Sequence, residues 1–485
     1  MMLPIFSLLF TIASATALSS RQQVSATDVC EQIRGKITGE VTFGLTSLSK
    51  IFDSKISHYM RSSSSETPTC VVEVASDEDV SIVMQIISKT KTPFAVKCGG
   101  HTSNPGFSST TGVFILLARL DQVKVSNDKS TVEIGTGLRW VDVYDALDGT
   151  GVNVVGGRVS GPGVGGFTLG GGYSWFTNQY GLACDTIISF TLVLPDGTIT
   201  KVDSTKPDLF FALKGGLNRF GVVTSIVFKT VPQAHQVYGG VKYYEADSIP
   251  DIITATTKFQ QENTDPKAQV ILTINGGIVP NAILIAFYDG PDRPSAFDPF
   301  DKVGGALPFV SHFKTQPFAS FVKVTPSNLQ AGHRGAFHTM MTTGLTPGFL
   351  NAVYNESKVY GKQAVKHSAT FLSYQVEPFG KYGQYATDSA FPHADSPLPL
   401  NLYFSWELSS EDAFWRGVMQ RSIDHLTEVA KAEGIYSSAP AYPNYALSTY
   451  RGDQIYGPTN AARLRKIQDQ YDPDRVMLLA GGFDI

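Results

Sequence analysis

The sequence predicts an α+β protein with more than one domain, and three features lead to this prediction. Of its 485 residues 42% are hydrophobic and 17% charged, a globular composition with enough apolar material for a sizeable core. At roughly 100–200 residues per domain, the length favours two or three domains. Strand and helix patterns alternate up to about residue 235, and longer strand-like runs between Pro- and Gly-rich loops follow. We therefore expect a domain boundary near residue 235.

The amino-terminus has the pattern of a secretory signal peptide. Residues 3–18 form an apolar stretch, and Ala15 and Ala17 suit an A-x-A cleavage site, although no Lys or Arg precedes the stretch. We expect a signal peptide over residues 1–18 and a protein in the secretory pathway or outside the cell. No later stretch reaches the 18 consecutive apolar residues of a membrane span, so no membrane partner is expected.

The first domain begins with a strand at Cys70 and a helix that Ser76 caps, with acidic residues in its first turn and its end near Lys89. Pro195-Asp196-Gly197 predicts a hairpin turn. The other expected elements are strands over residues 94–96, 112–120, 131–134, 186–194, 198–202 and 220–228 and a short helix over 142–147. Beyond the boundary we expect strands over 268–273 and 283–287 and helices over 411–433 and 459–471.

The four cysteines permit one or two disulfides in an oxidising compartment. Cys30 and Cys70 are the expected pair, because a link between them would hold the amino-terminal segment. Cys98 and Cys184 lie within glycine-rich motifs and are expected to be buried thiols. There is no CxxC motif, and no metal is predicted. A glycosylation sequon starts at Asn355 and predicts an exposed loop.

Glycine is concentrated in one segment, with 11 glycines among residues 149–172. Residues 161–166 match G-x-G-x-x-G, but we reject a Rossmann site. Its fingerprint must open a helix, and Gly170, Gly171 and Gly172 follow, each costing a helix about 1 kcal/mol. Backbone amides without side chains can instead approach a flat or anionic ligand closely.

Several motifs together resemble the berberine-bridge-enzyme-like group of the vanillyl-alcohol-oxidase superfamily, which are FAD-linked oxidoreductases with a PCMH-type FAD-binding domain. The resemblance runs from about Cys70 to the carboxyl-terminus and implies a two-lobed α+β fold, with an antiparallel sheet and helices in the second lobe. The motifs are KCGGH at 97–101, the segment 156–173, NQYGLACD at 178–185, DLFFALKGGLNRFGVVTSIVF at 208–228, YPNY at 442–445 and the blocks between 456 and 473. The implied segments are 1–18 (signal peptide), 19–65 (amino-terminal segment), 66–238 (FAD-binding domain), 239–444 (substrate-binding domain) and 445–485 (return to the FAD domain).

The resemblance implies that FAD is the cofactor and that His101 carries it covalently through the 8α-methyl group of the flavin. A neutral imidazole is a nucleophile, which suits this bond. Val159 occupies the position of a cysteine that makes a second flavin bond in some relatives, so a single attachment is expected. The other implied cofactor-binding residues are Lys97, Gly99, Gly100, Thr102, Ser103, Asn104, Gly161, Gly163, Gly165, Gly166, Gly171, Gly221 and Val222.

The implied catalytic residues are Tyr442, Tyr173 and Asn444. Free tyrosine has a pKa of about 10, so a tyrosine base needs a nearby cation, for which Arg158 is a candidate. Ser405 stands where many relatives carry a catalytic Glu, or Lys and Gln, on the strand before the long helix. The strand before the long helix therefore does not identify the base. Glu407 is the carboxylate near this position, but its register does not match that of the family. His393 matches a family motif and suits either an assisting or a structural role.

The expected activity is oxidation of a small alcohol, phenolic or alkaloid-like metabolite, with O2 as electron acceptor and H2O2 as product. Pro162 occupies a position linked to oxygen access in relatives, which leaves oxidase and dehydrogenase behaviour both open. The alternatives are an oligosaccharide oxidase that forms a lactone and a flavoprotein cyclase without net redox. A net charge of −4 and the lack of a Lys and Arg cluster argue against a nucleic-acid partner. The oligomeric state is not predicted.

Overall fold

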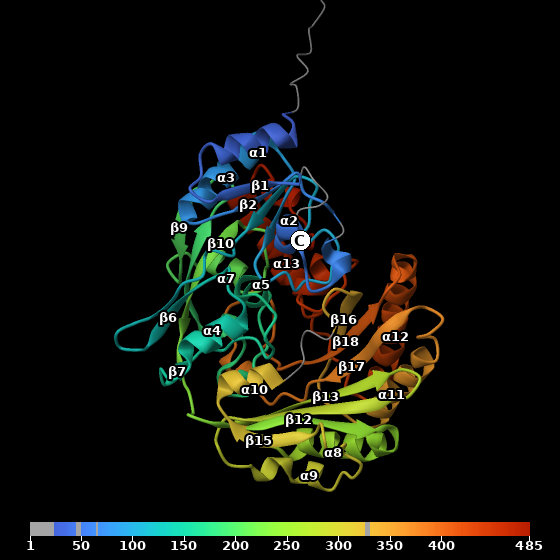
Figure 1. The fold of residues 1–485 in the computed structure, drawn as a ribbon. Coiled ribbons are helices and arrows are strands. Elements are labelled where there is room, and N and C mark those ends of the chain that lie inside the picture. The colour runs from blue at the N-terminus through green and yellow to red at the C-terminus, as the bar shows by residue number, and fades with distance from the viewer. Residues whose placement is uncertain (1–23, 45–49, 65, 325–329) are drawn as a thin grey trace, which may run out of the picture.

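The computed structural model describes residues 24–44, 50–64, 66–324 and 330–485. The signal peptide expected over residues 1–18 lies outside this part of the chain. The described residues form two lobes that face each other, and the chain enters the second lobe near residue 237 (Figure 1). Helices and sheets occur in both lobes, so the predicted two-lobed α+β class is confirmed.

The first lobe opens with a four-stranded sheet in the order β1-β2-β4-β3. Its three later strands are parallel, and β1 joins the edge in antiparallel orientation. The Ser76 hydroxyl accepts a hydrogen bond from the Asp79 amide and caps α3 as predicted. A disulfide joins Cys30 in α1 to Cys70 in β2, which confirms the expected pair. The elements are β1 (Glu40–Phe43), β2 (Cys70–Glu73), β3 (Phe94–Lys97), β4 (Val113–Leu116), α1 (Ala26–Arg34), α2 (Lys50–Ile56), a 3₁₀ turn η1 (Arg61–Ser64) and α3 (Asp77–Thr90).

A second sheet of the first lobe is antiparallel throughout, in the order β5-β6-β10-β8-β9. The glycine-rich segment contains one short helix, α5, which begins after Gly163 and stops at Gly170, so these glycines limit its length without preventing it. The elements are β5 (Val123–Val125), β6 (Thr131–Gly135), β8 (Ile187–Val193), β9 (Ile199–Val202) and β10 (Val222–Lys229), the small pair β7 (Val152–Asn153) and β11 (Val231–Pro232), and the helices α4 (Trp140–Leu147), α5 (Val164–Leu169), α6 (Thr177–Tyr180) and α7 (Pro207–Leu213).

The second lobe is built on a seven-stranded antiparallel sheet in the order β15-β12-β14-β13-β17-β18-β16. Helix α11 packs on β13 and β17, and α12 packs on β16, so these helices cover the face turned away from the first lobe (Figure 1). The elements are β12 (Val237–Glu245), β13 (Ala268–Gly276), β14 (Asn281–Tyr288), β15 (His312–Gln316), β16 (Arg334–Thr342), β17 (Ala369–Val376), β18 (Leu398–Trp406), α8 (Ile249–Glu262), α9 (Asp298–Asp301), α10 (Phe318–Val324), α11 (Pro347–Gly361) and α12 (Asp412–Ala432).

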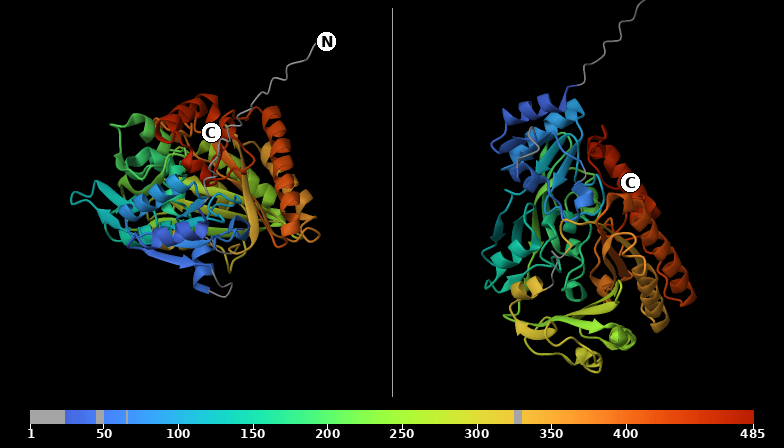
Figure 2. Two further views of the ribbon diagram at one scale, coloured as in Figure 1. Left: turned by 90° about the horizontal axis from the view of Figure 1, so that it is seen from above. Right: turned by 45° about the vertical axis from the view of Figure 1, so that its right-hand side comes forward.

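The carboxyl-terminal segment returns to the first lobe, and the carboxyl-terminus lies beside that lobe in the views of Figure 2. Helix α13 (Gly452–Tyr471) contains the predicted last helix as its second part, because Gly457 breaks it with a φ of 71°. The buried Arg219 guanidinium donates to the carbonyls of Met477, Ala480 and Phe483 and holds this end of the chain. Among the helices of the described residues, none combines the length and apolar character needed to cross a bilayer.

The sequon at Asn355 lies in helix α11, so the predicted loop is wrong. The reason is the helical spacing of buried side chains, which places Phe349, Leu350 and Val353 on the sheet. Asn355 is exposed, whereas Ser357 is buried and donates its hydroxyl hydrogen to the Tyr354 carbonyl.

Candidate active site and cofactor site

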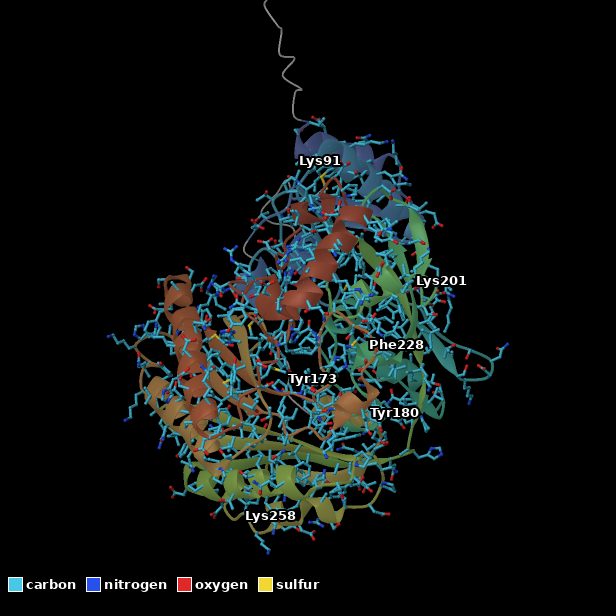
Figure 3. The ribbon with its side chains drawn as sticks, turned by 180° about the vertical axis from the view of Figure 1, so that it is seen from behind. Lys91, Tyr173, Tyr180, Lys201, Phe228 and Lys258 are labelled. Atoms are coloured by element: carbon cyan, nitrogen blue, oxygen red, sulfur yellow. A yellow bond between two sulfur atoms is a disulfide. The ribbon has the colours of Figure 1, made fainter. Side chains whose placement is uncertain are left out.

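A cavity of about 450 Å³ lies between the two lobes. One wall is formed by the loop that follows β3 and by the glycine-rich segment, and the opposite wall by the inner face of the seven-stranded sheet, including Val241, Ile271 and Ile285. Figure 3 shows Tyr173 near the centre of the molecule, whereas Lys91, Lys201 and Lys258 lie at its periphery. Because its two walls differ in this way, the cavity has a glycine-lined end and an apolar end.

Glycine is required where the two loops meet, because their backbones touch. A methyl group on Gly99 would lie 2.4 Å from the Gly163 nitrogen, and one on Gly163 would lie 2.3 Å from the Gly99 nitrogen. One on Gly165 would meet the Cys98 sulfur at 2.7 Å. Gly166 instead has nothing within 4 Å of such a methyl group and lines the cavity, so a ligand can approach its backbone closely.

His101 lies at the end of the loop after β3, and its imidazole is nearly parallel to two neighbouring aromatic rings. The ring of Tyr59 is 4.1 Å away and nearly parallel, and that of Phe337 is 6.1 Å away and also parallel. Burial lowers the pKa of His101 to about 4, so the imidazole is neutral at pH 7. Its Nε2 atom is buried without a hydrogen-bond partner among the described residues. A neutral ring with an uncommitted nitrogen suits a covalent bond to a cofactor.

The predicted cofactor-binding residues line the cavity except for Gly161 and Gly171. Several of their polar groups are already bonded within the protein. The Lys97 ammonium donates to the carbonyls of Lys55 and Ser57, and burial lowers the pKa of Lys97 to about 8. Asn104 bonds the backbone of Ala446 and Ser448 from the returning segment, and the Ser103 hydroxyl accepts from the Phe337 amide. These three side chains shape the loop more than they offer free donors.

Tyr442 and Asn444 are neighbours in the cavity wall. The phenolic oxygen of Tyr442 accepts hydrogen bonds from Asn444 Nδ2 at 2.9 Å and from the Gly172 amide at 3.1 Å. Burial nevertheless raises the pKa of Tyr442 to about 12, although Arg158 acts in the opposite direction. Arg158, the candidate cation, does act to lower this pKa, but desolvation outweighs it and the net direction is upward.

Tyr173 also lines the cavity, but its hydroxyl is engaged elsewhere. It lies 2.7 Å from the Tyr382 hydroxyl and donates to the Pro397 carbonyl at 3.2 Å. The ring stacks on Phe379 and meets Tyr442 edge-on. This geometry favours a packing role for Tyr173.

A buried ion pair borders the cavity. This pair was not predicted from the sequence. Arg158 Nη1 lies 2.7 Å from Glu377 Oε2, and both side chains are at most 8% exposed. Tyr445 joins the pair, because its hydroxyl accepts from Arg158 Nη2 at 2.7 Å and donates to Glu377 Oε1 at 3.1 Å. The signal for Glu377 in the sequence is a single acidic residue directly after the strand β17.

The strand before the long helix, β18, presents Asn401 and Tyr403 to the cavity. Asn401 Nδ2 donates to Gln375 at 2.9 Å, and the hydroxyls of Tyr403 and Tyr59 lie 2.6 Å apart. Ser405 and Glu407 do not line the cavity; Glu407 is about half exposed and pairs with His333. Ser405, the family position for a strand base, thus lies two to four residues beyond the part of β18 that lines the cavity.

His393 lies outside the cavity and pairs with Asp185, with 2.8 Å between His393 Nε2 and Asp185 Oδ2. The His393 Nδ1 atom contacts the Phe391 carbonyl. Cys184 is close enough for the three side chains to resemble a metal site, but the Asp185 oxygens also accept from Leu182 and Thr387. The ring nitrogens of His393 and the carboxylate oxygens of Asp185 therefore already bond to groups within the protein, which favours a structural role for His393.

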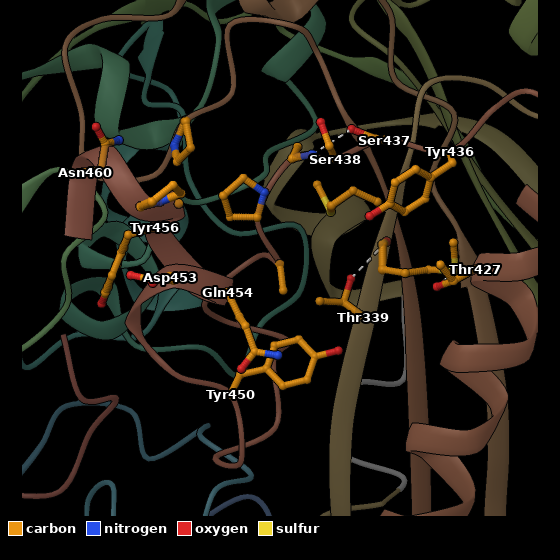
Figure 4. A pocket seen from close by; sticks show the side chains of 18 of the residues that line it. Thr339, Thr427, Tyr436, Ser437, Ser438, Tyr450, Asp453, Gln454, Tyr456 and Asn460 are labelled. Atoms are coloured by element: carbon orange, nitrogen blue, oxygen red, sulfur yellow. Dashed lines mark hydrogen bonds between the residues drawn. The ribbon is translucent and has the colours of Figure 1, made fainter. Parts of the chain in front are cut away.

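A second cavity, of about 500 Å³, lies beside the start of α13 (Figure 4). Its wall mixes polar and apolar side chains, and the polar ones include Thr339, Tyr436, Ser437, Gln454 and Asn460. None of the predicted site residues lines it. The cavity between the lobes is therefore the candidate for the cofactor and the reaction.

Comparison with known proteins agrees with this location. A family model described as an FAD binding domain matches residues 68–203, which include the loop of His101 and the glycine-rich segment. An FAD-dependent monooxygenase of Arthrobotrys oligospora is 31% identical over 464 residues, which cover 92% of this chain and 86% of that protein.

Solved structures show the same fold at lower identity. Berberine-bridge-enzyme-like 1 of Physcomitrella patens has a TM-score of 0.76 at 18% identity, covering 92% of this chain and 97% of the other. Glucooligosaccharide oxidase of Acremonium strictum has a TM-score of 0.77 at 18% identity, covering 93% and 98%. The latter is described as carrying a 6-S-cysteinyl, 8α-N1-histidyl FAD.

Proposed function

Because the chain belongs to the berberine-bridge-enzyme-like FAD-linked oxidoreductases, we propose that it oxidises a largely apolar alcohol or phenolic metabolite and passes the electrons to O2. The observation that carries this proposal is the shared cavity. The space bordered by the glycine loops and His101 is closed on its other side by an apolar sheet face and by the pair Arg158–Glu377.

FAD fits the glycine-lined end of this cavity. Gly166 leaves open space beside its backbone, and the neutral ring of His101 has an unpartnered nitrogen. We propose a single covalent attachment at His101, because Val159 lines the cavity where a second link would need a cysteine. Attachment forms a bond between a ring nitrogen and the flavin 8α-methyl carbon. It breaks one N–H and one C–H bond and transfers two electrons to the flavin and then to O2, which yields H2O2.

The substrate end favours a flat apolar molecule with few polar groups. Its sheet wall consists mainly of side chains such as Val241, Ile271, Ile283 and Ile285, with Tyr243 and Phe371 at partly exposed positions. A phenolic or alkaloid-like ring system can bury its faces against this wall. An oligosaccharide would leave many hydroxyl groups without partners there, which argues against the sugar-oxidase alternative.

The polar groups can move the substrate proton. FAD, when bound, supplies the hydride acceptor in this type of reaction. We propose that Tyr445 accepts the proton of the substrate hydroxyl while its own proton passes to Glu377 Oε1, 3.1 Å away. Arg158 holds the carboxylate in place. Tyr442, whose high pKa keeps it protonated at pH 7, is suited to hydrogen-bond the substrate oxygen together with Asn444.

Monooxygenation is a second candidate, because the relative from Arthrobotrys oligospora carries that name. A redox-neutral cyclisation is a third, kept open by the absence of a glutamate at the family position on β18. We also propose that the enzyme is secreted. The support is the apolar stretch over residues 3–18 and the disulfide Cys30–Cys70, since disulfides persist in oxidising compartments.

The decisive experiment starts with the purified protein, His101→Ala and, as a matched control, the exposed His425→Ala. Acid-precipitated protein is examined by visible spectroscopy and intact mass. We expect wild type and His425→Ala to retain one FAD each and His101→Ala to lose it. A colourless wild-type pellet without added mass would contradict the covalent assignment.

Aromatic alcohols, phenols and oligosaccharides are then compared for O2 uptake and H2O2 release under 18O2. The oxidase proposal requires one H2O2 per product and no label in the product. Label in the product would identify a monooxygenase, product without O2 uptake a cyclase, and turnover of sugars alone would overturn the apolar substrate class.

A further inference from the structure

A segment upstream of the FAD-binding domain connects the His101 loop to the second lobe. The Tyr59 amide donates to the Gly100 carbonyl at 2.9 Å, and the Gly332 amide donates to the Tyr59 carbonyl at 2.9 Å. Two residues later, the Arg61 amide donates to the His333 carbonyl, and the Ser62 hydroxyl donates to the Gly335 carbonyl. We name residues 58–63 the strap, because they are bonded to both lobes.

Through Tyr59 the strap reaches the imidazole of His101. The two rings are 4.1 Å apart with an angle of 11° between their planes, and the ring of Phe337 on β16 is also parallel to the imidazole, with its centroid 6.1 Å away. The Tyr59 hydroxyl is 2.6 Å from that of Tyr403 on β18. Tyr59 is therefore fixed at its backbone, at its hydroxyl and by its ring stack.

His101 has few other means of orientation. It follows Gly99 and Gly100, and Gly100 has a φ of 69°. Glycine has a wider range of allowed backbone conformations than other residues, so this backbone restrains His101 weakly. Its Nε2 atom makes no hydrogen bond with the described residues. The ring also hydrogen-bonds its own backbone, so stacking is the contact from another residue that sets the plane of the imidazole. Bond formation from a ring nitrogen depends on that plane, because the reacting atoms must meet along one direction.

We propose that Tyr59 is a positioning residue for the covalent attachment of FAD to His101. The inference rests on the attachment proposed above and adds that residues outside the FAD-binding domain control its rate. Tyr59 acts through its aromatic ring, and its hydroxyl serves to anchor it to Tyr403. The two parts of the side chain can therefore be separated by substitution.

The test compares Tyr59→Leu, which removes the ring, with Tyr59→Phe, which keeps the ring and removes the hydroxyl. Tyr385→Leu, at a partly exposed tyrosine outside the cavity, is the matched control. Apoprotein is mixed with FAD, and the covalent fraction is followed over time by acid precipitation and intact mass. Non-covalent FAD binding is measured separately by flavin fluorescence, and folding by thermal unfolding.

We expect Tyr59→Leu to bind FAD but to form the bond about tenfold more slowly, as the loss of an aromatic stack predicts. Tyr59→Phe should react within about twofold of wild type, and Tyr385→Leu at the wild-type rate. Attachment at the wild-type rate in Tyr59→Leu would overturn the proposal. Equal slowing in Tyr59→Leu and Tyr59→Phe would assign the effect to the hydroxyl and would overturn it as well.

Two further outcomes are distinguishable. Should wild type carry no covalent FAD, the attachment at His101 fails and this inference fails with it. If Tyr59→Leu does not fold, Tyr59→Gln replaces it, since glutamine lacks the ring but can still hydrogen-bond Tyr403. The same tenfold slowing is required of that variant, and a wild-type rate would again overturn the proposal.

Discussion

His101 and Tyr442 stand in the wall of one cavity, and burial keeps both of them uncharged at pH 7. It lowers the pKa of His101 to about 4 and raises that of Tyr442 to about 12. A neutral imidazole can act as a nucleophile, and a neutral phenol can donate a hydrogen bond to a substrate oxygen. Among the described residues, the charged groups in the wall of this cavity are Arg158 and Glu377, which neutralise each other, and the ammonium of Lys97.

This ion pair predicts a large effect of Glu377→Gln on stability. Removing the carboxylate charge leaves the Arg158 guanidinium buried without a counter-charge, and breaking such a pair costs about 3–5 kcal/mol. We expect a loss of that order in the free energy of unfolding from urea denaturation, together with slower substrate oxidation. The loss of activity follows because Glu377 no longer accepts a proton from Tyr445.

The matched control is Glu407→Gln, because Glu407 also pairs with an arginine, Arg61, but is 46% exposed. Surface pairs contribute about 0–1 kcal/mol, so this variant should unfold close to wild type. Equal losses in the free energy of unfolding of the two variants would show that the buried pair stabilises the protein no more than the exposed one.

Motifs close in sequence could be predicted residue by residue, and contacts across the lobes could not. His101, Gly163 and Tyr442 belong to recognisable motifs, and all three line the cavity. Glu377 and Tyr59 belong to no motif that we identified, and their places depend on pairing of distant strands and on the strap. The net direction of the Tyr442 pKa could not be predicted, because the sequence offers Arg158 as a candidate cation but does not show how deeply the phenol is buried.

At the scale of elements, the helix patterns with clear caps were predicted closely. Helix α3 starts after Ser76 as expected, and α12 ends before Gly434, whose φ is 70°. The sequon helix α11 was missed at Asn355 because a polar sequon was weighted above the apolar spacing around it. The break in α13 was also incompletely predicted. Gly457 and Pro458 indicate the start of the helix that follows them, but not the helical turn from Gly452 that precedes them.

Gly457→Ala is expected to destabilise the protein. Gly457 has φ 71° and ψ 159°, a region that is essentially restricted to glycine, and forcing another residue into it costs about 1–3 kcal/mol. An added methyl group would have room, with its nearest contact at 3.4 Å to Pro440, so the cost is one of backbone conformation. Urea denaturation of the purified variant measures it.

Gly417→Ala supplies a control of opposite sign. Gly417 lies inside α12, and a methyl group there would meet only the flexible end of Arg421 at 3.2 Å. Alanine should stabilise this helix by about 0.5–1 kcal/mol. Destabilisation by both substitutions would contradict the conformational explanation.

At the scale of the whole molecule, the site exists because two separately built lobes close on each other. The strap, the Asn104 contacts to residues 446–448 and the Arg219 contacts to the carboxyl-terminal segment join parts of the chain that are far apart in sequence. The sequence patterns predicted a domain boundary near residue 235 and the family resemblance implied the two lobes, but neither predicted these long-range contacts. Local sequence contains no information on which carbonyl a distant arginine will meet.

Stability of the apoprotein should fall as the pH drops from about 6.5 to 4. Burial lowers the pKa of His58 and of His338 to about 4, so the folded state keeps them neutral where the unfolded state, with an ordinary value of 6.5, binds protons. Stability present above pH 6.5 is therefore lost as the pH falls, by roughly 3 kcal/mol per group at pH 4. Urea denaturation across this pH range should show a shallower dependence for His338→Gln, and an unchanged one for the exposed His425→Gln.

The disulfide Cys30–Cys70 gives a prediction for the amino-terminal segment as a whole. It closes a loop of 40 residues, and chain entropy assigns such a link a stabilisation of about 4 kcal/mol. The double variant Cys30→Ala/Cys70→Ala should unfold at lower urea, and wild type should follow it when a reductant is added. Because this loop includes Tyr59, the variant should also attach FAD more slowly. A wild type that is insensitive to reductant, with four free thiols by mass, would contradict both expectations.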